Sequence, residues 1–529
     1  MSREPVQRSA ERGRLVFDAS PRSLSICWAL ILLLWLGIQL GLARPESIVG
    51  DWNGWRQADT QTIAQNFAKD RIDPLHPRVA WGGDGSGLVE TEVQIYPAIV
   101  AFVLRWSGPA EWPGQFISAL SWAAAATGLL LALQRRFGAV PALLGGVFFL
   151  ASPLAVFLST AVMPEALSIA YYTFALVCFL EFIRTTRFAF LCISTALALV
   201  AAFIKPTALN LGIIEFALVV FMAPRLLRLP ALWASWLLIL LAFAVALWHG
   251  HMNFHEGGNS FGVISSGTDL KFPRPGDFLD PFVLLRTGWL TVKWSLGWVG
   301  IAALIWIVIR DRLLAEELAI AAGAAAALLI SLRYSWDQPH YHVFTIILGA
   351  WLVAHATATL RLENRKSHVP VVAAAIGLGI GVLVYVPALR DRITYDPGPQ
   401  VQNLVRVGSR LKDIAKPGDL VVVRSLDGAY DHQWQRRNNF EDPRLLYLAN
   451  VTGWVLPADR PALDELKSYV DRGARFYVET TPLISDPGLS RWLKDAGTTV
   501  IDDAAGVIVR FDGTSGQDLS GTLPDGTVQ

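Results

Sequence analysis

Long apolar stretches, separated by short charged loops, recur along most of this chain and limit the folds open to it more than any other feature. A helix needs about 20 residues to cross roughly 30 Å of hydrocarbon. Of the 529 residues, 53% are hydrophobic and only 17% are charged, which is too apolar for an ordinary soluble domain. The sequence therefore predicts an α-helical polytopic membrane protein.

About eleven stretches are long enough to span a membrane. They lie at residues 24–43, 115–134, 139–160, 163–183, 188–204, 207–223, 229–249, 289–309, 314–332, 342–360 and 369–389. A further apolar segment at 96–106 is too short to span, and we interpret it as an interfacial helix.

Positive charges in the short loops predict the orientation of the spans. Arginine-containing loops fall on the same side as the arginine-rich tail at 1–23, and they lie at 134–138, 184–187, 225–228, 310–312 and 361–366. Such loops are retained in the cytoplasm, so the N-terminal tail is predicted to be cytoplasmic. Residues 44–113 and 250–288 then form long external loops, and the chain after residue 390 is also external.

The C-terminal part has a different pattern, in which short alternating segments replace the long apolar stretches. Residues 418–425 and 475–480 read as strands, and residues 461–474 read as an amphipathic helix. We predict a small extracytoplasmic α/β domain at 390–514, which is large enough for its own core. The last residues, 515–529, are rich in Gly, Ser, Thr and Asp and are predicted to be disordered.

Composition and motifs exclude several classes of function. A net charge of +1 gives no reason to expect a nucleic-acid partner. The three cysteines lie in apolar stretches and read as small core residues, not as a disulfide or metal set. The sequence has no phosphate-binding glycine loop after a strand, no HExxH and no CxxC, so nucleotide-driven transport and zinc hydrolysis have no support.

Polar residues concentrate in the first external loop, beginning with the stretch DWNGWRQADTQTIAQNF at 51–67. Its candidate functional side chains are Asp51, Arg56, Gln57 and Asp59. Residues 60–69 fit a short amphipathic helix for which Asp59 is a plausible N-cap, so this carboxylate has a structural and a chemical interpretation. Arg56 also has two interpretations: an ion pair with a lipid headgroup or a carboxylate, or a contact to substrate.

The same loop continues with a glycine-rich turn at 78–87 and then with Glu90 and Glu92. In an extended segment these two carboxylates share one face, where they repel unless a metal, an arginine or a proton lies between them. Hard oxygen ligands of this kind suit a divalent ion such as Mg, Mn or Zn. A solvated loop without metal is the alternative interpretation.

Two further groups are expected at the external ends of spans. Lys205 precedes Pro206, which ends a helix and leaves the ammonium at the membrane boundary; the alternative is a lysine that only snorkels to the interface. His340 and Tyr341 lie in DQPHYHVF at the start of a span, where an aromatic-belt role is the alternative to substrate contact. Glu165 is a further ionisable group close to the membrane.

Four motifs carry a family resemblance through their order and placement. GWRQADTQTIAQNF, PRVAWGGDGSGLVETEVQIYP, MPEAL and IKPTAL together are similar to the ArnT-like and RgtA/B/C/D-like branch of glycosyltransferase family 39, within the GT-C superfamily. The resemblance covers about residues 24–390. It implies a GT-C-like transmembrane domain at 24–389 whose first external loop, 44–113, is catalytic.

The resemblance also implies a reaction. A hexosyl or pentosyl group would pass from a polyprenyl (undecaprenyl) phosphate donor, with inversion, to an extracytoplasmic acceptor such as lipid A, a cell-envelope glycan or a protein. The bacterial cytoplasmic membrane would be the location, with the C-terminal domain in the periplasm or outside the cell.

The family pattern assigns expected roles to the residues named above. A loop acid acts as general base, for which Asp59 and Asp51 are the candidates, and Glu92 orients the sugar or a metal. Cations surround the leaving phosphate. The expected substrate contacts are Arg56, Gln57, Glu90, Lys205, His340 and Tyr341, and the expected metal ligands are Glu90 and Glu92.

A transporter or flippase of lipid-linked sugars is the alternative function. It would be expected to show repeated halves and charges distributed along a transmembrane path. The polar residues here gather in one loop and no repeat is visible, which favours an enzyme. A scaffold without catalysis would leave the clustered acids unexplained.

Overall fold

The computed structural model describes residues 21–45, 47–261, 264, 272–360, 369–425, 430–431, 436–437, 442–458, 461–480 and 486–511. The predicted tail at 515–529 and residues 1–20 of the predicted N-terminal tail lie outside this part. The chain divides into two compact units. The first comprises Met1–Arg78 and Leu88–Asp396, and the second comprises Val79–Gly87 and Pro397–Gln529.

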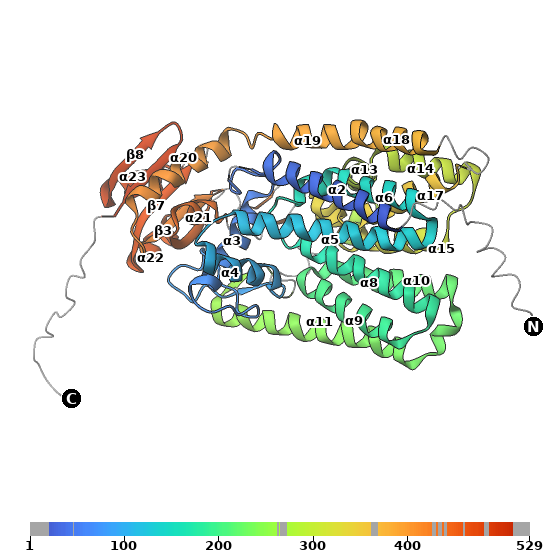
Figure 1. The fold of residues 1–529 in the computed structure, drawn as a ribbon. Helices are drawn as coiled ribbons and strands as arrows, with labels where there is room; N and C mark the ends of the chain where they lie inside the picture. Colours follow the sequence, from blue (N-terminus) through green and yellow to red (C-terminus); the bar gives the residue numbers. More distant parts are fainter. Residues whose placement is uncertain are drawn as a thin grey trace, which may run out of the picture. The chain divides into compact units, whose positions relative to one another are not determined.

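The first unit is a bundle of helices (Figure 1). Its α-helices are α2 (Pro21–Gly41), α3 (Gly54–Lys69), α4 (Ile95–Ser107), α5 (Trp112–Phe137), α6 (Ala139–Ala151), α7 (Pro153–Leu158), α8 (Glu165–Thr185), α9 (Phe188–Ile204), α10 (Asn210–Met222), α11 (Pro230–Gly257), α13 (Pro281–Thr291), α14 (Gly297–Arg310), α15 (Ala315–Ile330), α16 (Leu332–Ser335), α17 (Thr345–Ala358), α18 (Val369–Ile380) and α19 (Val386–Ile393). Short helical turns join them: η1 (Pro206–Leu209), η2 (Pro224–Arg228), η3 (Pro275–Phe278), η4 (Val292–Leu296), η5 (Pro339–His342) and η6 (Gly381–Tyr385). Strands β1 (Val89–Glu90) and β2 (Asn259–Ser260) pair in parallel.

Helix length and composition identify a multi-pass membrane protein. In the described part of the chain, 6 helical segments are long and apolar enough to cross a membrane: Arg22–Gly41, Trp112–Phe137, Glu165–Thr185, Pro230–Gly257, Pro281–Arg310 and Val372–Ile393. Shorter apolar helices coincide with four other predicted spans, at Ala139–Ala151, Phe188–Ile204, Pro206–Met222 and Thr345–Ala358. The total of about eleven spans and their orientation stay predictions.

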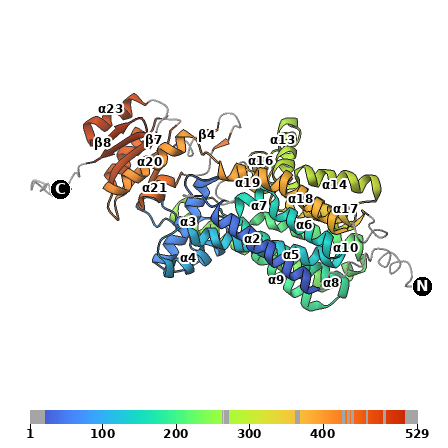
Figure 2. The same ribbon diagram turned by 45° about the horizontal axis from the view of Figure 1, so that its top comes forward.

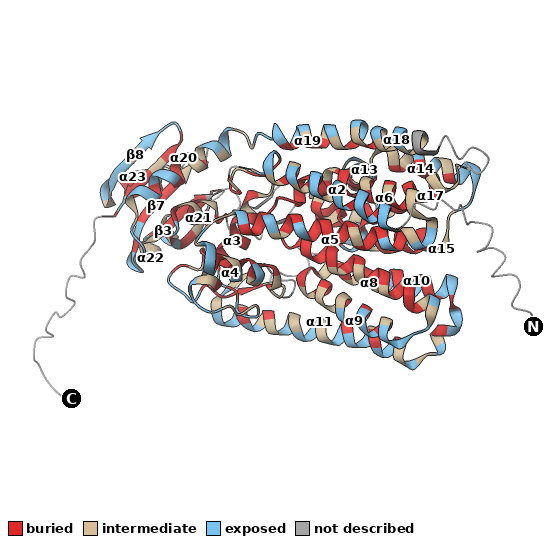
Figure 3. Ribbon diagram, in the orientation of Figure 1, coloured by how far each residue is buried: buried red, intermediate tan, exposed pale blue. Residues whose placement is uncertain are grey.

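Burial separates the inner helices from the outer ones (Figure 3). The most apolar window of α8 is 72% buried, whereas that of α11 is only 17% buried. Exposed apolar residues on α11, such as Leu240 and Val245, suit a surface that faces lipid. The polar groups of the site must therefore be sought around the inner helices.

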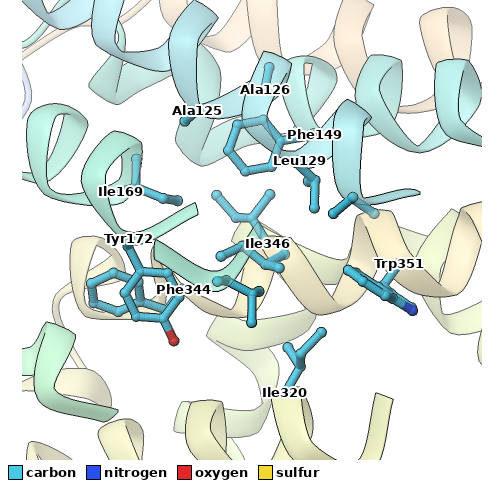
Figure 4. Packing of buried hydrophobic residues seen from close by; sticks show 14 of the residues in the cluster. Ala125, Ala126, Leu129, Phe149, Ile169, Tyr172, Ile320, Phe344, Ile346 and Trp351 are labelled. Carbon is cyan, nitrogen blue, oxygen red and sulfur yellow. The ribbon is translucent and has the colours of Figure 1, made fainter. Parts of the chain in front are cut away.

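The core of the first unit lies between α5, α6, α8 and α17 (Figure 4). The rings of Tyr172 and Phe344 stack with their centroids 4.4 Å apart. At Gly145 an added Cβ would lie 2.7 Å from the carbonyl oxygen of Ala350, so only glycine allows α6 to approach α17 this closely. This packing fixes the inner helices that carry the site.

The second unit is an α/β structure, and Figure 2 shows β7 and β8 beside α20, α21 and α23. Its helices are α20 (Pro399–Ile414), α21 (Arg444–Ala449), α22 (Leu463–Asp471) and α23 (Pro487–Ala496). The five-stranded sheet has the order β6 (Thr452–Pro457), β3 (Leu420–Ser425), β7 (Ala474–Thr480), β9 (Gly506–Arg510) and β8 (Thr498–Asp503). A separate two-stranded sheet pairs β4 (Tyr430–Asp431) with β5 (Arg436–Arg437).

Strand direction in the large sheet changes from one side to the other. β3 pairs in parallel with both β6 and β7, and β9 pairs antiparallel with β7 and β8. The sequence places residues 79–87 in the first external loop alone, but in the structure they belong to this second unit.

Candidate functional site

Helix α3 begins earlier than the sequence predicts, and this changes the interpretation of Asp59. Asn53 adopts a left-handed conformation (φ 54°) before the helix, and Gly54 is required because a Cβ there would lie 2.3 Å from the carbonyl oxygen of Val49. Asp59 is then a buried residue inside the helix, so its prediction as the N-cap is wrong. Against the lowering effect of burial, the charges of Glu165 and Glu92 raise the pKa of Arg56, and the charge of Asp59 makes a smaller contribution in the same direction.

Asp51 is held in a buried ion pair with Arg392, near the end of α19. One guanidinium nitrogen contacts Oδ1, and the other donates to Oδ2 at 2.9 Å. Gln57 Nε2 also donates to Oδ2 at 2.8 Å, and the Asp51 side chain is 1% exposed. Because both carboxylate oxygens are occupied, the geometry favours a structural role for Asp51 over that of a general base.

Gln57 is likewise engaged within the protein. Its Nε2 donates to Asp51 and to the carbonyl oxygen of Trp52, and its Oε1 accepts the backbone N–H of Val162 at 2.8 Å. These bonds connect the start of α3 to the turn before α8. The expected substrate contact of Gln57 finds no support in this arrangement.

Four charged side chains from separate elements meet inside the first unit, and we call them the charged cluster: Arg56, Glu92, Glu165 and Lys205. Arg56 Nη2 lies 3.2 Å from Glu92 Oε1, and Arg56 Nε lies 3.8 Å from Glu165 Oε1. Lys205 Nζ donates to the same Glu165 oxygen at 2.5 Å. The side chains of Glu165 and Lys205 are 0% and 6% exposed, whereas those of Arg56 and Glu92 are 21% and 19% exposed.

Local sequence explains how two of these residues reach the cluster. Pro206 follows Lys205 and ends α9 at Ile204, which places the lysine at a helix terminus, as predicted from the sequence. Glu165 is the first residue of α8, where the helix dipole favours a carboxylate. From the sequence, Glu165 is only an ionisable group near the membrane, because its partners in the site come from distant segments.

His340 and Tyr341 in η5 border the charged cluster. Lys205 Nζ lies 5.3 Å from the centroid of the Tyr341 ring, and the rings of His340 and Tyr341 are 4.6 Å apart. The side-chain amide nitrogen Nδ2 of Asn53 lies 3.4 Å from His340 Nδ1. His340 is 1% exposed, so its alternative interpretation as part of an aromatic belt is wrong.

Burial and mutual attraction set the protonation of these groups. Burial alone would lower the pKa of Arg56 and raise that of Glu92, but the opposite charges outweigh it, so the pKa of Arg56 is raised and that of Glu92 is lowered. Burial and Arg56 lower the pKa of Lys205 despite the attraction of Glu165. Burial holds the pKa of His340 well below its usual value, so this imidazole is neutral at pH 7.

Some buried polar atoms around the charged cluster have no hydrogen-bond partner within the described residues. They are Arg56 Nε, Glu165 Oε2 and His340 Nε2. In folded proteins the great majority of buried polar atoms have a hydrogen-bond partner, so these three atoms are suited to contact a bound molecule. The site can donate from Arg56 and Lys205 to an anion and can exchange hydrogen bonds with hydroxyl groups through Glu165 and His340.

Glu90 and Glu92 do not form the predicted pair on one face. Strand β1 ends at Glu90 and the chain bends at Glu92, which turns to Arg56. Glu90 instead accepts from Ser260 Oγ and from the backbone N–H of Ile264, both at 3.0 Å. Because the two carboxylates turn to different partners, they do not fit a metal held jointly by Glu90 and Glu92. In the described ranges, no group of three or more His, Cys, Asp and Glu side chains could hold a metal ion.

Comparison with known proteins identifies the fold. No family model and no curated protein matches the sequence. ArnT from Cupriavidus metallidurans, in a crystal structure bound to undecaprenyl phosphate, aligns over 92% of this chain and 97% of its own, with a TM-score of 0.59 and 15% identity.

A second solved structure is the archaeal oligosaccharyltransferase AglB from Archaeoglobus fulgidus, in complex with an inhibitory peptide and a dolichol-phosphate. It aligns over 86% of this chain and 69% of its own, with a TM-score of 0.58 and 12% identity. At this identity the likeness concerns the fold. The chain thus shares the overall fold of ArnT and AglB, which agrees with the resemblance carried by its sequence.

Proposed function

We propose that this protein is a membrane glycosyltransferase that moves a sugar from a polyprenyl phosphate to an extracytoplasmic acceptor. The observation that carries this proposal is the charged cluster, in which Lys205 is buried and Arg56 is partly buried beside polar atoms that have no hydrogen-bond partner among the described residues. Two proteins of the same fold support the ligand class, since ArnT is bound to undecaprenyl phosphate and AglB to a dolichol-phosphate.

The chemistry requires a site for a leaving phosphate. In an inverting transfer the acceptor oxygen bonds to the anomeric carbon while the bond from that carbon to the phosphate oxygen breaks. Negative charge then develops on the polyprenyl phosphate, where Arg56 and Lys205 would stabilise it. Both cations are now paired with Glu92 and Glu165, so the donor phosphate would replace these carboxylates as their partner.

The acceptor hydroxyl must also lose a proton to a base. Asp59, predicted from the sequence, remains a candidate, but the geometry favours Glu92, whose side chain is 19% exposed while Asp59 is 4% exposed. When Arg56 turns to the phosphate, the carboxylate of Glu92 is released and becomes more basic, because the neighbouring cation that lowers its pKa is drawn away. No step requires a metal held by Glu90 and Glu92.

The second candidate function, transport of lipid-linked sugars, gains no support from the charge distribution. Arg56, Glu92, Glu165 and Lys205 gather at one place and pair with one another, whereas a transporter is expected to have substrate groups between related halves. Lipid A, a cell-envelope glycan and a protein stay open as acceptors. The bacterial cytoplasmic membrane, with an extracytoplasmic second unit, is the proposed location.

The proposal is tested in a deletion strain that carries wild-type or variant genes. Mass spectrometry would measure surface glycans and polyprenyl-phosphate sugars. We expect the deletion and Lys205→Gln to remove one sugar from the surface and to accumulate its lipid donor. Wild type and Lys412→Gln, a matched change at an exposed position of α20, should restore both. Unchanged glycans and lipid donors in the deletion strain would refute the proposed function.

A further inference from the structure

Residues Val79–Gly87, here called the docked segment, pack against the rest of the second unit. The backbone N–H of Gly453 in β6 donates to the carbonyl oxygen of Ala80 at 2.9 Å, and the N–H of Gly83 donates to the carbonyl oxygen of Gly453 at 2.7 Å. β6 is an edge strand that pairs with β3 on its other side. The docked segment therefore covers part of an exposed sheet edge.

The fit at Gly83 is too close for any side chain. Gly83 has φ +65°, and an added Cβ would lie 2.0 Å from Nε1 of Trp454. Trp454 is itself buried and stacks on Tyr469, with ring centroids 4.7 Å apart and planes at 7°. Because Trp454 belongs to the buried core of the second unit and Tyr469 packs against that core, the docked segment packs directly on it.

An ion pair adds to these contacts. Arg472 Nε lies 3.1 Å from Asp84 Oδ2, and its Nη2 contacts Oδ1, which makes the pair two-pronged. The guanidinium also lies 5.1 Å from the centroid of the Trp454 ring. The hydrogen bond from Arg472 lowers the pKa of Asp84, so the carboxylate stays ionised at neutral pH.

The chain leads directly from the docked segment to the charged cluster. Val79 N–H donates to the carbonyl oxygen of Gly87 at 2.9 Å, which closes the segment at its base. Arg78 and Leu88 form an antiparallel bridge, and Leu88 leads into β1 and then to Glu92. Leu88 is at the base of the docked segment, and Glu92 thus follows it by only four positions.

We propose that the docked segment is a positioning element: the second unit holds Val79–Gly87 and thereby fixes the loop that presents Glu92 to Arg56. The catalytic meaning of this proposal rests on the proposed function. A loop residue that is free to move samples many conformations, and ordering it costs backbone entropy. An anchored loop has already lost that freedom, so Glu92 is in place when the acceptor arrives.

A charge exchange tests the ion pair with Asp84→Arg, Arg472→Asp and the double variant. Hydrogen exchange on the purified full-length protein would follow the amides of Gly83 and Gly453, and the deletion strain would report transfer. Each single variant should speed exchange about fivefold, the scale of an exposed ion pair, and should reduce surface sugar. The double variant should restore both readouts.

A glycine substitution tests the close fit separately. Gly83→Ala should accelerate exchange and reduce transfer, because its Cβ has no space beside Trp454. Gly488→Ala, in α23 of the second unit, is the matched control, since its Cβ would meet nothing closer than 3.5 Å. Unchanged exchange in all the single variants would overturn the docking, and faster exchange with normal transfer would overturn the positioning role. If wild type itself shows no transfer, the proposed function fails, while the exchange result still decides the docking.

Discussion

Replacing Asp51 with asparagine distinguishes a structural acid from a catalytic one. Asp51→Asn keeps the size of the side chain but removes the charge that faces Arg392. Both side chains are at most 2% exposed, so the arginine would remain buried without a counterion. Losing one partner of a buried ion pair costs about 3–5 kcal/mol, which is a large part of the stability of a typical domain. The remaining contact to Thr160, at 3.1 Å, supplies no charge.

The assay is chemical unfolding of the purified protein in detergent, followed by tryptophan fluorescence. We expect Asp51→Asn to unfold at a clearly lower denaturant concentration than wild type. Asp51→Asn combined with Arg392→Met should recover most of the loss, because no unpaired charge is then buried. Wild-type stability in Asp51→Asn together with lost transfer would refute this reasoning and make Asp51 the base.

Three further predictions concern the charged cluster and Asp59. Lys205→Ala and Arg56→Ala should each weaken the stabilisation of the transition state by about 2–4 kcal/mol, measured as kcat/KM for the lipid donor, and normal kinetics would remove them from the mechanism. Since the pKa of Lys205 is lowered, kcat/KM should fall as the pH rises through a value below the pKa of an ordinary lysine. Lys205→Arg should move this alkaline decline to higher pH. An unchanged pH profile in Lys205→Arg would contradict the assignment. If Asp59 is the base, Asp59→Asn should lower turnover about 10²-fold or more in a folded protein, whereas Glu92→Gln should do so if Glu92 is the base.

The sequence predicts the helices and strands of this protein better than the contacts between them. Long apolar stretches predict the helices because crossing a bilayer imposes a length, and Pro206 predicts the end of α9 because proline removes a backbone donor. The prediction of Asp59 as an N-cap is wrong because an acid before an apolar pattern resembles a cap, whereas α3 begins at Gly54, after Asn53.

The spacing of residues along the sequence does not predict contacts between distant segments. Asp51 and Arg392 are separated by 341 positions, and Lys205 and Glu165 by 40. Neither pair follows a helical or strand period, so each depends on how the helices pack. The docked segment is a similar case, because the glycines at 83 and 453 indicate turns in the sequence but not that the two backbones meet.

Direct binding of a lipid phosphate tests the central claim most closely. Native mass spectrometry of the purified protein would compare undecaprenyl phosphate with undecaprenol, which has the same chain but no phosphate. We predict that wild type and Lys412→Gln bind the phosphate, that Lys205→Gln and Arg56→Gln bind it about tenfold more weakly, and that undecaprenol does not distinguish the four proteins. Equal binding of undecaprenyl phosphate by all four would contradict the assignment of the charged cluster as the phosphate site.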